Sequence, residues 1–250
     1  MRQIGKTYPL KSVFITGILV FLAVMFTGCI QSNRSVIRMQ KLEEGVQNPT
    51  SVEELQQAIK KYQGRVADIQ LAQSQIGIWY KILGTRYLDN KMYGEALKTF
   101  QKAVEYYPAN SNLYYYIGVC AGYMANSALD FDATGSSEKR YNYLKLSESG
   151  YKRAIELDPK SSRALYGLGV LYVFELDQSE KAIPYLEKLL GFDTKHTDAM
   201  FVLARAYYEN HEFDKAVALY DKILSLTTSE EKKAEAEANK KIVLDASYAK

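Results

Sequence analysis

Histidines are scarce in this chain, although metal sites and nucleophilic catalysis often depend on them. The 250 residues contain two, His196 and His211, and both fall in or near expected turns. No spacing aligns either histidine with further ligands on one helix face, as a metal site would need. A serine nucleophile needs a base within reach, and neither histidine lies in a motif of that kind. We therefore expect no enzymatic activity, no catalytic residues, no metal site and no cofactor.

The segment SALDFDATGSSEKRYNY (residues 127–143) has several polar residues of a calcium-binding loop but lacks its key ligand. The twelfth position of an EF-hand loop supplies a bidentate glutamate, and here that position is Tyr141. We therefore expect no calcium binding, and the polar residues favour an exposed loop. The residues that match the first, third, fifth, sixth and ninth loop positions are Asp130, Asp132, Thr134, Gly135 and Glu138.

The amino terminus has the features of a secretory signal. Three basic residues precede the apolar run VFITGILVFLAVMFTG (residues 13–28), which ends at Cys29. The run is shorter than the ~20 apolar residues that a spanning helix needs, and its basic start and small end are typical of a signal peptide. The last four residues, Phe-Thr-Gly-Cys, resemble the bacterial lipobox. This resemblance implies a signal peptide over residues 1–28, palmitate-type acylation of Cys29 and a polar tether over residues 29–50. The alternative is an uncleaved signal anchor with a chance cysteine.

The charge and cysteine content of the chain bear on nucleic-acid binding, disulfide formation and membrane anchoring. Residues 1–28 contain three of the 32 basic residues and none of the 29 acidic ones, so the remainder is balanced. A balanced chain gives no electrostatic indication of nucleic-acid binding. Once Cys29 is acylated, Cys120 is the only other cysteine, and no intrachain disulfide can form. Several acyl chains anchor a protein stably. Ile30, rather than aspartate, follows Cys29, which by the enterobacterial sorting rule implies the outer membrane, facing the periplasm.

A 34-residue repeat dominates the rest of the chain. In its first copy, large residues surround two small ones, Gly84 and Ala96, and a proline follows. Two helices pack closely where small residues let their backbones approach, and proline ends a helix. The spacing therefore predicts a pair of antiparallel helices in each copy. The first copy comprises Tyr80, Leu83, Gly84, Tyr87, Ala96, Phe100, Ala103 and Pro108.

This spacing resembles the tetratricopeptide repeat at every signature position. The resemblance implies an all-α fold, a right-handed solenoid of about four helix–turn–helix repeats over residues 77–230. An N-terminal helix or degenerate repeat (residues 51–76) precedes it, and a capping helix (residues 231–250) follows. The repeats are expected at residues 77–110, 111–161, 162–196 and 197–230.

The second and third copies depart from the 34-residue period. In the second copy, 17 extra residues at 127–143 predict an inserted helical hairpin, and long insertions of this kind often have a function. In the third, Gly169 and Ala182 are 13 rather than 12 residues apart. We place this extra residue in the turn between the two helices.

Two flanking helices complete the expected architecture. Ser51 and Glu54 form a capping-box pattern that begins a helix, either one long helix or a further degenerate pair. At the other end, four apolar residues recur every four positions and form a narrow apolar face on the otherwise polar capping helix. They are Ala234, Ala238, Ile242 and Ala246.

The family resemblance also implies which residues line the concave face, namely positions two, five, nine, twelve and thirteen of each repeat. Tyr115, Tyr166 and Phe201 occupy the fifth position of repeats two, three and four and so form an aromatic stripe. Aromatic residues are favoured anchors at protein interfaces. In full, the implied positions are Ile78, Lys81, Thr85, Leu88 and Asp89; Asn112, Tyr115, Val119, Gly122 and Tyr123; Arg163, Tyr166, Val170, Val173 and Phe174; and Asp198, Phe201, Arg205, Tyr208 and Glu209. As binding residues we select Tyr115, Val119, Tyr123, Arg163, Tyr166, Val170, Phe174, Phe201, Arg205 and Tyr208.

These residues indicate an apolar ligand, either a peptide or a hydrophobic small molecule. The lysine and asparagine clamp of chaperone-binding relatives is not reproduced here. One alternative is that residues 51–75 fill the groove, which would make the groove residues part of the ordinary core. Cys120 is expected to be a small buried residue. We expect a membrane-anchored scaffold for protein–protein interaction in the bacterial cell envelope, within an assembly or transport complex. The alternative function is hydrophobic ligand handling in a periplasmic TRAP-type transport system.

Overall fold

The computed structural model of the chain describes residues 51–128 and 137–248. The predicted signal peptide, Cys29, the tether and residues 129–136 of the calcium-loop-like segment lie outside the described residues. The chain divides into two units, residues 1–69 and residues 70–250.

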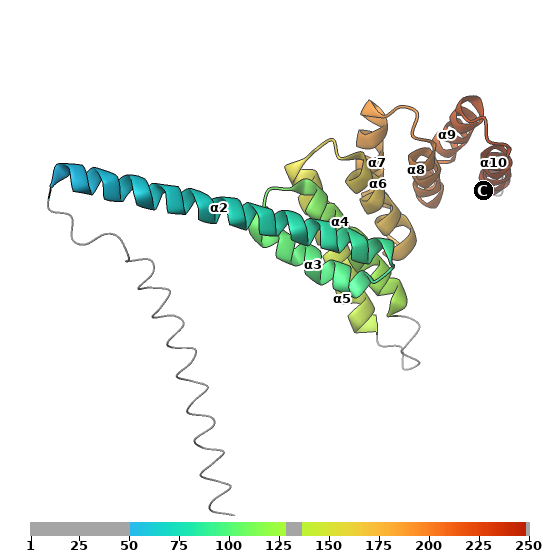
Figure 1. The fold of residues 1–250 in the computed structure, drawn as a ribbon. Helices are drawn as coiled ribbons and strands as arrows, with labels where there is room; N and C mark the ends of the chain where they lie inside the picture. Colours follow the sequence, from blue (N-terminus) through green and yellow to red (C-terminus); the bar gives the residue numbers. More distant parts are fainter. Residues whose placement is uncertain (1–50, 129–136, 249–250) are drawn as a thin grey trace, which may run out of the picture. The chain divides into compact units, whose positions relative to one another are not determined.

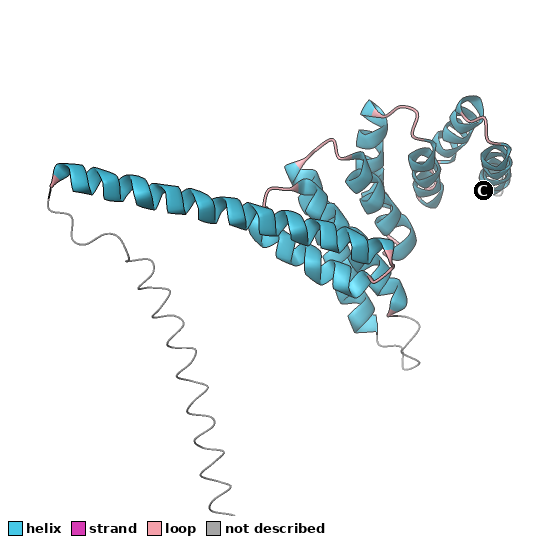
Figure 2. Ribbon diagram, in the orientation of Figure 1, coloured by secondary structure: helices cyan, strands magenta, loops and turns pink. Residues whose placement is uncertain are grey.

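The described residues form nine α-helices and one π-helical segment, without a strand (Figure 1, Figure 2). The predicted all-α fold is confirmed. Within the second unit, consecutive helices from α3 to α10 pack against one another in chain order. None of the helices described is both long enough and apolar enough to cross a membrane. The elements are α2 (Val52–Asp89), α3 (Tyr93–Tyr106), α4 (Ser111–Ser127), α5 (Ser137–Leu157), α6 (Ser162–Val170), η1 (Leu171–Glu175), α7 (Ser179–Phe192), α8 (Thr197–Glu209), α9 (Phe213–Leu226) and α10 (Glu230–Tyr248).

Small residues hold the two helices of each repeat together, as the spacing predicted. A Cβ atom added to Gly84 would lie 2.7 Å from the ring of Phe100, and one added to Gly169 would lie 2.5 Å from Leu186. Both distances are below van der Waals contact, so only glycine fits. In repeat four the same position is Ala204, which is fully buried.

The two helices of repeat two approach most closely. A Cβ atom added to Gly150 of α5 would lie 2.8 Å from the backbone nitrogen of Gly118 of α4. Ser147 replaces the usual alanine, and its hydroxyl donates to the carbonyl oxygen of Gly118 at 2.8 Å. A buried hydroxyl without such an acceptor would be unfavourable. Helix α5 has 21 residues where α3 has 14, so residues 137–143 of the insertion add two helical turns to it.

The turns between helices A and B of repeats one, three and four share one conformation. Each turn has three residues, and the middle one has a positive φ angle: 58° at Lys91, 50° at Asp177 and 62° at His211. A left-handed residue of this kind ends a helix by directing backbone N–H groups onto its last carbonyls. The turn of repeat three therefore has the same length as the turns of repeats one and four.

The extra residue of repeat three lies instead inside helix A, so our placement of it in the turn was wrong. The last turn residue, Gln178, donates its N–H to Tyr172, six residues earlier, at 2.8 Å. In repeat four the corresponding bond runs from Glu212 to Tyr207, five residues earlier. The difference of one residue is absorbed by the π-helical segment η1, where hydrogen bonds span five residues rather than four.

The structure has one continuous helix where the sequence left two interpretations. Helix α2 runs for 38 residues from Val52 to Asp89, so no element boundary separates residue 76 from residue 77. Its start is the predicted capping box: Ser51 N–H donates to Glu54, and Glu54 N–H donates to the Ser51 hydroxyl at 3.1 Å. The first-repeat helix A is the last part of α2.

The predicted apolar face of the last helix is not the face that it buries. In α10 the buried residues are Ala236 and Val243, whereas Ala238 and Ile242 are exposed. Ala238 follows Ala204 by 34 residues and so occupies the helix-A position that a following helix B would cover. Among the described residues no helix follows α10, and the alanines stay exposed.

Candidate functional site

Two adjacent hollows lie along the helices A of repeats two to four, and Tyr166 lines both. The first has a volume of about 320 Å³ and is formed by α4, α5, α6 and η1. The second, of about 420 Å³, is formed by α6, η1, α8, α9 and α10. We call the two hollows together the groove. The structure brings all ten predicted binding residues into it: Tyr115, Val119, Tyr123, Arg163, Tyr166, Val170, Phe174, Phe201, Arg205 and Tyr208.

Aromatic rings and one arginine shape the first hollow. The guanidinium of Arg163 lies 4.8 Å from the ring centroid of Tyr115 and donates to the side-chain oxygen of Asn112 at 2.6 Å. Burial raises the pKa of Tyr115, although the nearby arginine opposes this. The tyrosine is therefore neutral at physiological pH, and its hydroxyl can both donate and accept a hydrogen bond.

The inserted turns of α5 contribute an ion pair at this hollow. Arg140 Nη2 lies 2.7 Å from Glu175 Oε2, and each side chain is about a quarter exposed. Glu175 is the last residue of η1 and lines the hollow. Within the described part of the chain, Arg140 Nε is buried without a hydrogen-bond partner. The insertion of repeat two thus contacts the π-helical segment of repeat three.

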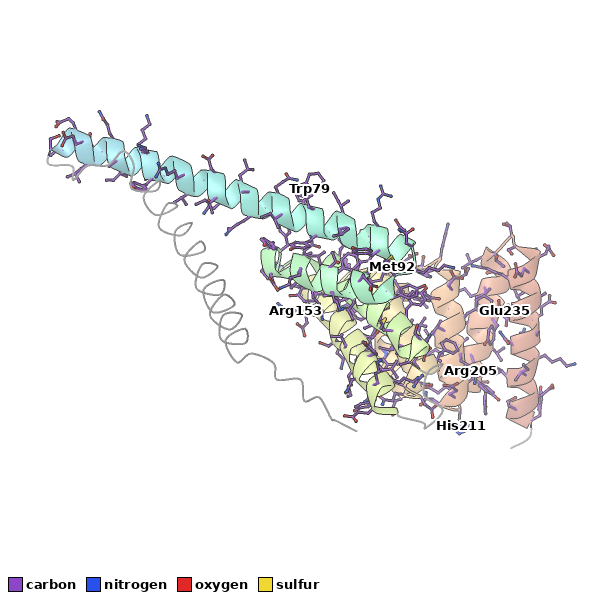
Figure 3. All side chains as sticks on the ribbon, turned by 60° about the horizontal axis from the view of Figure 1, so that its bottom comes forward. Trp79, Met92, Arg153, Arg205, His211 and Glu235 are labelled. Atoms are coloured by element: carbon purple, nitrogen blue, oxygen red, sulfur yellow. The ribbon has the colours of Figure 1, made fainter. Side chains whose placement is uncertain are left out.

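The second hollow combines exposed aromatic rings with paired charges. Arg205 Nε donates to Glu209 at 2.5 Å, and its guanidinium lies 5.5 Å from the ring centroid of Tyr208. Lys232 of α10 donates to Asp198 at 2.6 Å. Figure 3 labels Arg205 on α8 and Glu235 on α10, two of the helices that border this hollow. Because positive and negative side chains in this hollow are largely paired, its electrostatic potential does not favour a ligand of one charge. The hollow instead offers apolar contacts and hydrogen bonds.

One implied concave-face position was wrong. Val173 is only 5% exposed and belongs to the core, whereas the next two residues, Phe174 and Glu175, line the groove. The π-helical segment adds one residue before this point and so shifts the groove-facing positions by one. Seven further implied residues line neither hollow; they are Ile78, Lys81, Thr85, Leu88 and Asp89 of repeat one, Asn112 of repeat two and Glu209 of repeat four.

The sequence reasoning missed the contribution of α10 to the groove. Five of its residues line the second hollow, each 34 residues after an implied concave-face residue of repeat four, so the period alone contained the signal. They are Lys232, Glu235, Asn239, Ile242 and Val243.

Residues capable of other chemistry have structural roles. His196 caps α8, and its Nδ1 accepts the N–H of Ala199 at 3.1 Å. His211 is the left-handed residue of a turn. Cys120 is fully buried, as expected, and burial raises its pKa to about 12, so the thiolate that would react is not formed. The described residues contain no group of three or more His, Cys, Asp or Glu side chains placed to hold a metal ion.

Sequence comparisons agree with this architecture. Models of the tetratricopeptide repeat family match residues 79–110, 151–183 and 173–232. A TPR repeat-containing protein of Borreliella burgdorferi (strain ATCC 35210 / DSM 4680 / CIP 102532 / B31) is 24% identical over 220 residues, which cover 86% of this chain and 93% of the relative.

Solved structures share the fold at low sequence identity. YrrB, described as a TPR protein with an unusual peptide-binding site, aligns with a TM-score of 0.53 and 17% identity over 67% of this chain and 75% of its own. MamA from Desulfovibrio magneticus RS-1 aligns with a TM-score of 0.52 and 16% identity over 70% of this chain and 97% of its own. TTC0263, a TPR protein of Thermus thermophilus, aligns with a TM-score of 0.51 and 20% identity over 66% of this chain and 79% of its own. The predicted repeats are confirmed: this chain contains tetratricopeptide repeats arranged as a solenoid.

Proposed function

We propose that this chain is a non-enzymatic scaffold whose groove binds a segment of another protein of the bacterial cell envelope. The tetratricopeptide-repeat fold itself supports a role in protein–protein interaction. One observation carries the specific proposal: Tyr115, Tyr166 and Phe201, one aromatic ring from each of three successive repeats, line two adjacent hollows. Partly exposed aromatic residues in a concave surface are typical anchors for a partner.

The length of the groove favours a peptide segment over a compact ligand. Helices pack at interaxial distances of roughly 9 Å, so the three steps from α4 through α6 and α8 to α10 span about 27 Å. An extended chain rises ~3.4 Å per residue, so the groove accommodates about eight residues. YrrB has a similar fold, and its description includes a peptide-binding site.

The lining chemistry favours a partner segment with alternating apolar and polar side chains. Aromatic faces suit apolar side chains, while Arg163 and Glu175 can hydrogen-bond to a peptide backbone. A purely hydrophobic solute would cover these charged groups, which already bond to Asn112 and Arg140, without adding a hydrogen bond, at a cost in affinity. The groove therefore supports protein binding better than the TRAP-type ligand-handling alternative.

Photo-crosslinking from the centre of the groove tests this proposal in cells. A photoreactive amino acid at Tyr166 should capture another envelope protein, identified by mass spectrometry. The matched control places the same amino acid at Lys188, an exposed residue of α7 that lines neither hollow, and it should not capture that protein. A crosslink from Tyr166 only to residues 51–75 of the same chain would refute the proposal, because the groove would then be core.

We also propose that the scaffold is lipid-anchored through Cys29, on the outer membrane facing the periplasm. This part rests on the apolar run and the lipobox-like residues of the sequence. Cys29→Ser should give an unprocessed or soluble protein in fractionated cells, whereas Cys120→Ser should stay in the membrane fraction. Unchanged membrane association of Cys29→Ser would contradict lipid anchoring and leave the groove proposal intact.

A further inference from the structure

Helix α2 carries a second period that differs from the 34-residue repeat. From residue 52 to residue 76, large apolar residues recur at spacings of three and four, with Gln73 as the one polar member and Leu71 as the one large apolar residue outside the pattern. This is the heptad pattern of a coiled coil, in which the first (a) and fourth (d) positions face a partner helix. The a positions are Val52, Ile59, Val66 and Gln73, and the d positions are Leu55, Tyr62, Ile69 and Ile76. We call these eight residues the seam.

The apolar side chains of the seam are exposed. Val52 is 65% exposed, Ile59 56% and Ile69 54%. No residue from 52 to 76 is buried, and the buried residues of α2 are Gly77 and Gly84. Most helices in proteins gain their stability by packing an apolar face, and an exposed apolar stripe of this length indicates an interaction surface.

The end of the seam coincides with the start of repeat packing. The hydroxyl of Tyr107 donates to the backbone oxygen of Ser74 at 2.8 Å, and the ring of Tyr107 leaves no room for a Cβ atom at Gly77. From this point α2 packs as helix A of repeat one. Residues 52–76 therefore have a pattern of their own that the repeat array does not explain.

The period identifies the kind of partner. A seam that repeats every 3.5 residues packs over several turns only against a helix with the same period. A second copy of this chain offers such a helix with equal length and matching composition. The seam has β-branched residues at three of its a positions, and in combination with leucine at d, as at Leu55, such residues favour two parallel strands.

The polar residue of the seam fits the same arrangement. A single polar residue at an a position fixes the register of a coiled coil. In a parallel, in-register pair Gln73 would face Gln73 of the second copy, and each side-chain amide can both donate and accept. Any shifted register would place Gln73 against an apolar residue.

The area available is sufficient for a stable pair. A typical stable interface buries roughly 800 Å² per partner. Burying one aliphatic side chain removes on the order of 100 Å² from water. The seven apolar seam residues, together with flanking side chains, therefore reach the required area.

We infer that residues 52–76 pair with the same segment of a second copy as a parallel two-stranded coiled coil. The chain is then a dimer that presents two grooves, which would strengthen binding to a partner with two sites.

Cysteine crosslinking of the full chain tests both pairing and register. Ile69→Cys, at a d position, should form an intermolecular disulfide under mild oxidation, because equivalent d positions face each other in a parallel coiled coil. The control, Gly64→Cys, lies at an f position on the opposite side of the helix, where nothing approaches within 4 Å of an added Cβ atom. It should stay monomeric on a non-reducing gel. Equal crosslinking of both variants, or none from Ile69→Cys, would overturn the proposal.

A second variant separates loss of pairing from loss of folding. Val66→Asp places a charge in the seam and should reduce the mass measured by sedimentation of the detergent-solubilised chain from two copies to one. Its near-ultraviolet circular dichroism should stay close to that of the wild type, because Tyr62 is the only tyrosine of the seam and the tyrosines of the repeats lie elsewhere. A wild-type chain that sediments as one copy would also refute the proposal.

Discussion

Helix A of repeat three and helix A of repeat four occupy equivalent places in the solenoid but differ by one residue. In repeat four, α8 is regular and Tyr208 faces the groove. In repeat three, α6 continues into η1, and Phe174 and Glu175 face the groove where Val173 and Phe174 were expected. The comparison shows that this solenoid absorbs an inserted residue within a helix and keeps the turn unchanged.

The turn geometry that these repeats share explains why. Asp177 and His211 have nearly equal positive φ angles, and each turn ends with an N–H donated to a tyrosine carbonyl at 2.8 Å. Changing the turn would disturb a left-handed residue and the hydrogen bonds that end the helix. A π-helical turn instead keeps the backbone hydrogen-bonded and adds one residue, and such turns are frequent at functional sites.

The largest expected effect comes from deleting one residue from each helix. Deleting Tyr208 from α8 should lower the free energy of unfolding by about 5 kcal/mol or more, because this helix holds no extra residue and the bond from Glu212 to Tyr207 and the left-handed turn at His211 would be disrupted. Deleting Phe174 from η1 should cost far less, because a regular α-helix can replace the π-helical turn. Chemical denaturation of both variants checks this. Equal losses in the free energy of unfolding would show that the π-helical segment η1 does not accommodate an additional residue.

The small-residue sites give the next largest effect. Leu186→Ala should lower the free energy of unfolding by about 2–5 kcal/mol through cavity formation, and Gly169→Ala by about 1–3 kcal/mol through overpacking. In the double variant the added methyl group occupies the vacated space, so its loss should be smaller than the sum. The matched change in repeat four, Ala204→Gly, should cost about 1 kcal/mol. Additive losses in the double variant would contradict the packing seen at Gly169.

The ion pair at η1 should have a smaller effect. Arg140→Ala should lower the free energy of unfolding by about 1 kcal/mol, because the pair with Glu175 is only partly buried. The loss should shrink at high salt. For comparison, Lys102→Ala removes an exposed pair with Glu105 and should have almost no effect. If the two variants behave alike in denaturation at low salt, the contact between the insertion and η1 is not stabilising.

The smallest effect is a pH dependence that involves repeat three. Lys152 and Tyr172 donate to Glu148 at 2.7 and 2.8 Å. Burial by itself would raise the pKa of Glu148, but these two hydrogen bonds hold that pKa below its usual value of 4.5. A lowered folded-state pKa contributes stability above the unfolded-state pKa, and this stability is lost as the pH falls through the folded-state pKa.

Thermal unfolding, measured at a series of pH values from neutral to below the usual glutamate pKa of 4.5, checks this pH dependence. Glu148→Gln should unfold at a temperature that falls less steeply with acidification than that of the wild type. Glu156→Gln, which changes an exposed glutamate of the same helix, should follow the wild-type curve. Parallel curves for Glu148→Gln and the wild type would contradict the role of these hydrogen bonds.

Much of the groove was predictable from the sequence because repeats place equivalent residues on one face. The equivalence of Tyr115, Tyr166 and Phe201 follows from the period, and the family resemblance implies that their shared position faces the groove. The place of the extra residue in repeat three could not be predicted from the sequence, because the 13-residue spacing from Gly169 to Ala182 fits a longer turn as well as a longer helix. Only the backbone geometry at Asp177 decides between them.

The two ends of the array show different reasons for errors. In α10 the groove residues lie one period after those of repeat four and were missed, and the periodic alanines formed an apolar face that nothing among the described residues covers. In α2 the helix was predicted, yet its continuity through residue 76 depends on the absence of a helix-breaking residue and was left open. Periodicity identifies which face a residue occupies, whereas the presence of a neighbouring helix decides whether that face is buried.

The most direct test of the groove and of its register compares crosslinking from two adjacent residues. A small aliphatic diazirine amino acid placed at Phe174 should capture the partner protein, because Phe174 is 58% exposed and lines the second hollow. The same amino acid at Val173 should react only within the chain, because Val173 is buried. Capture from Val173 but not from Phe174 would contradict the π-helical register, and capture from neither position would contradict binding in the groove.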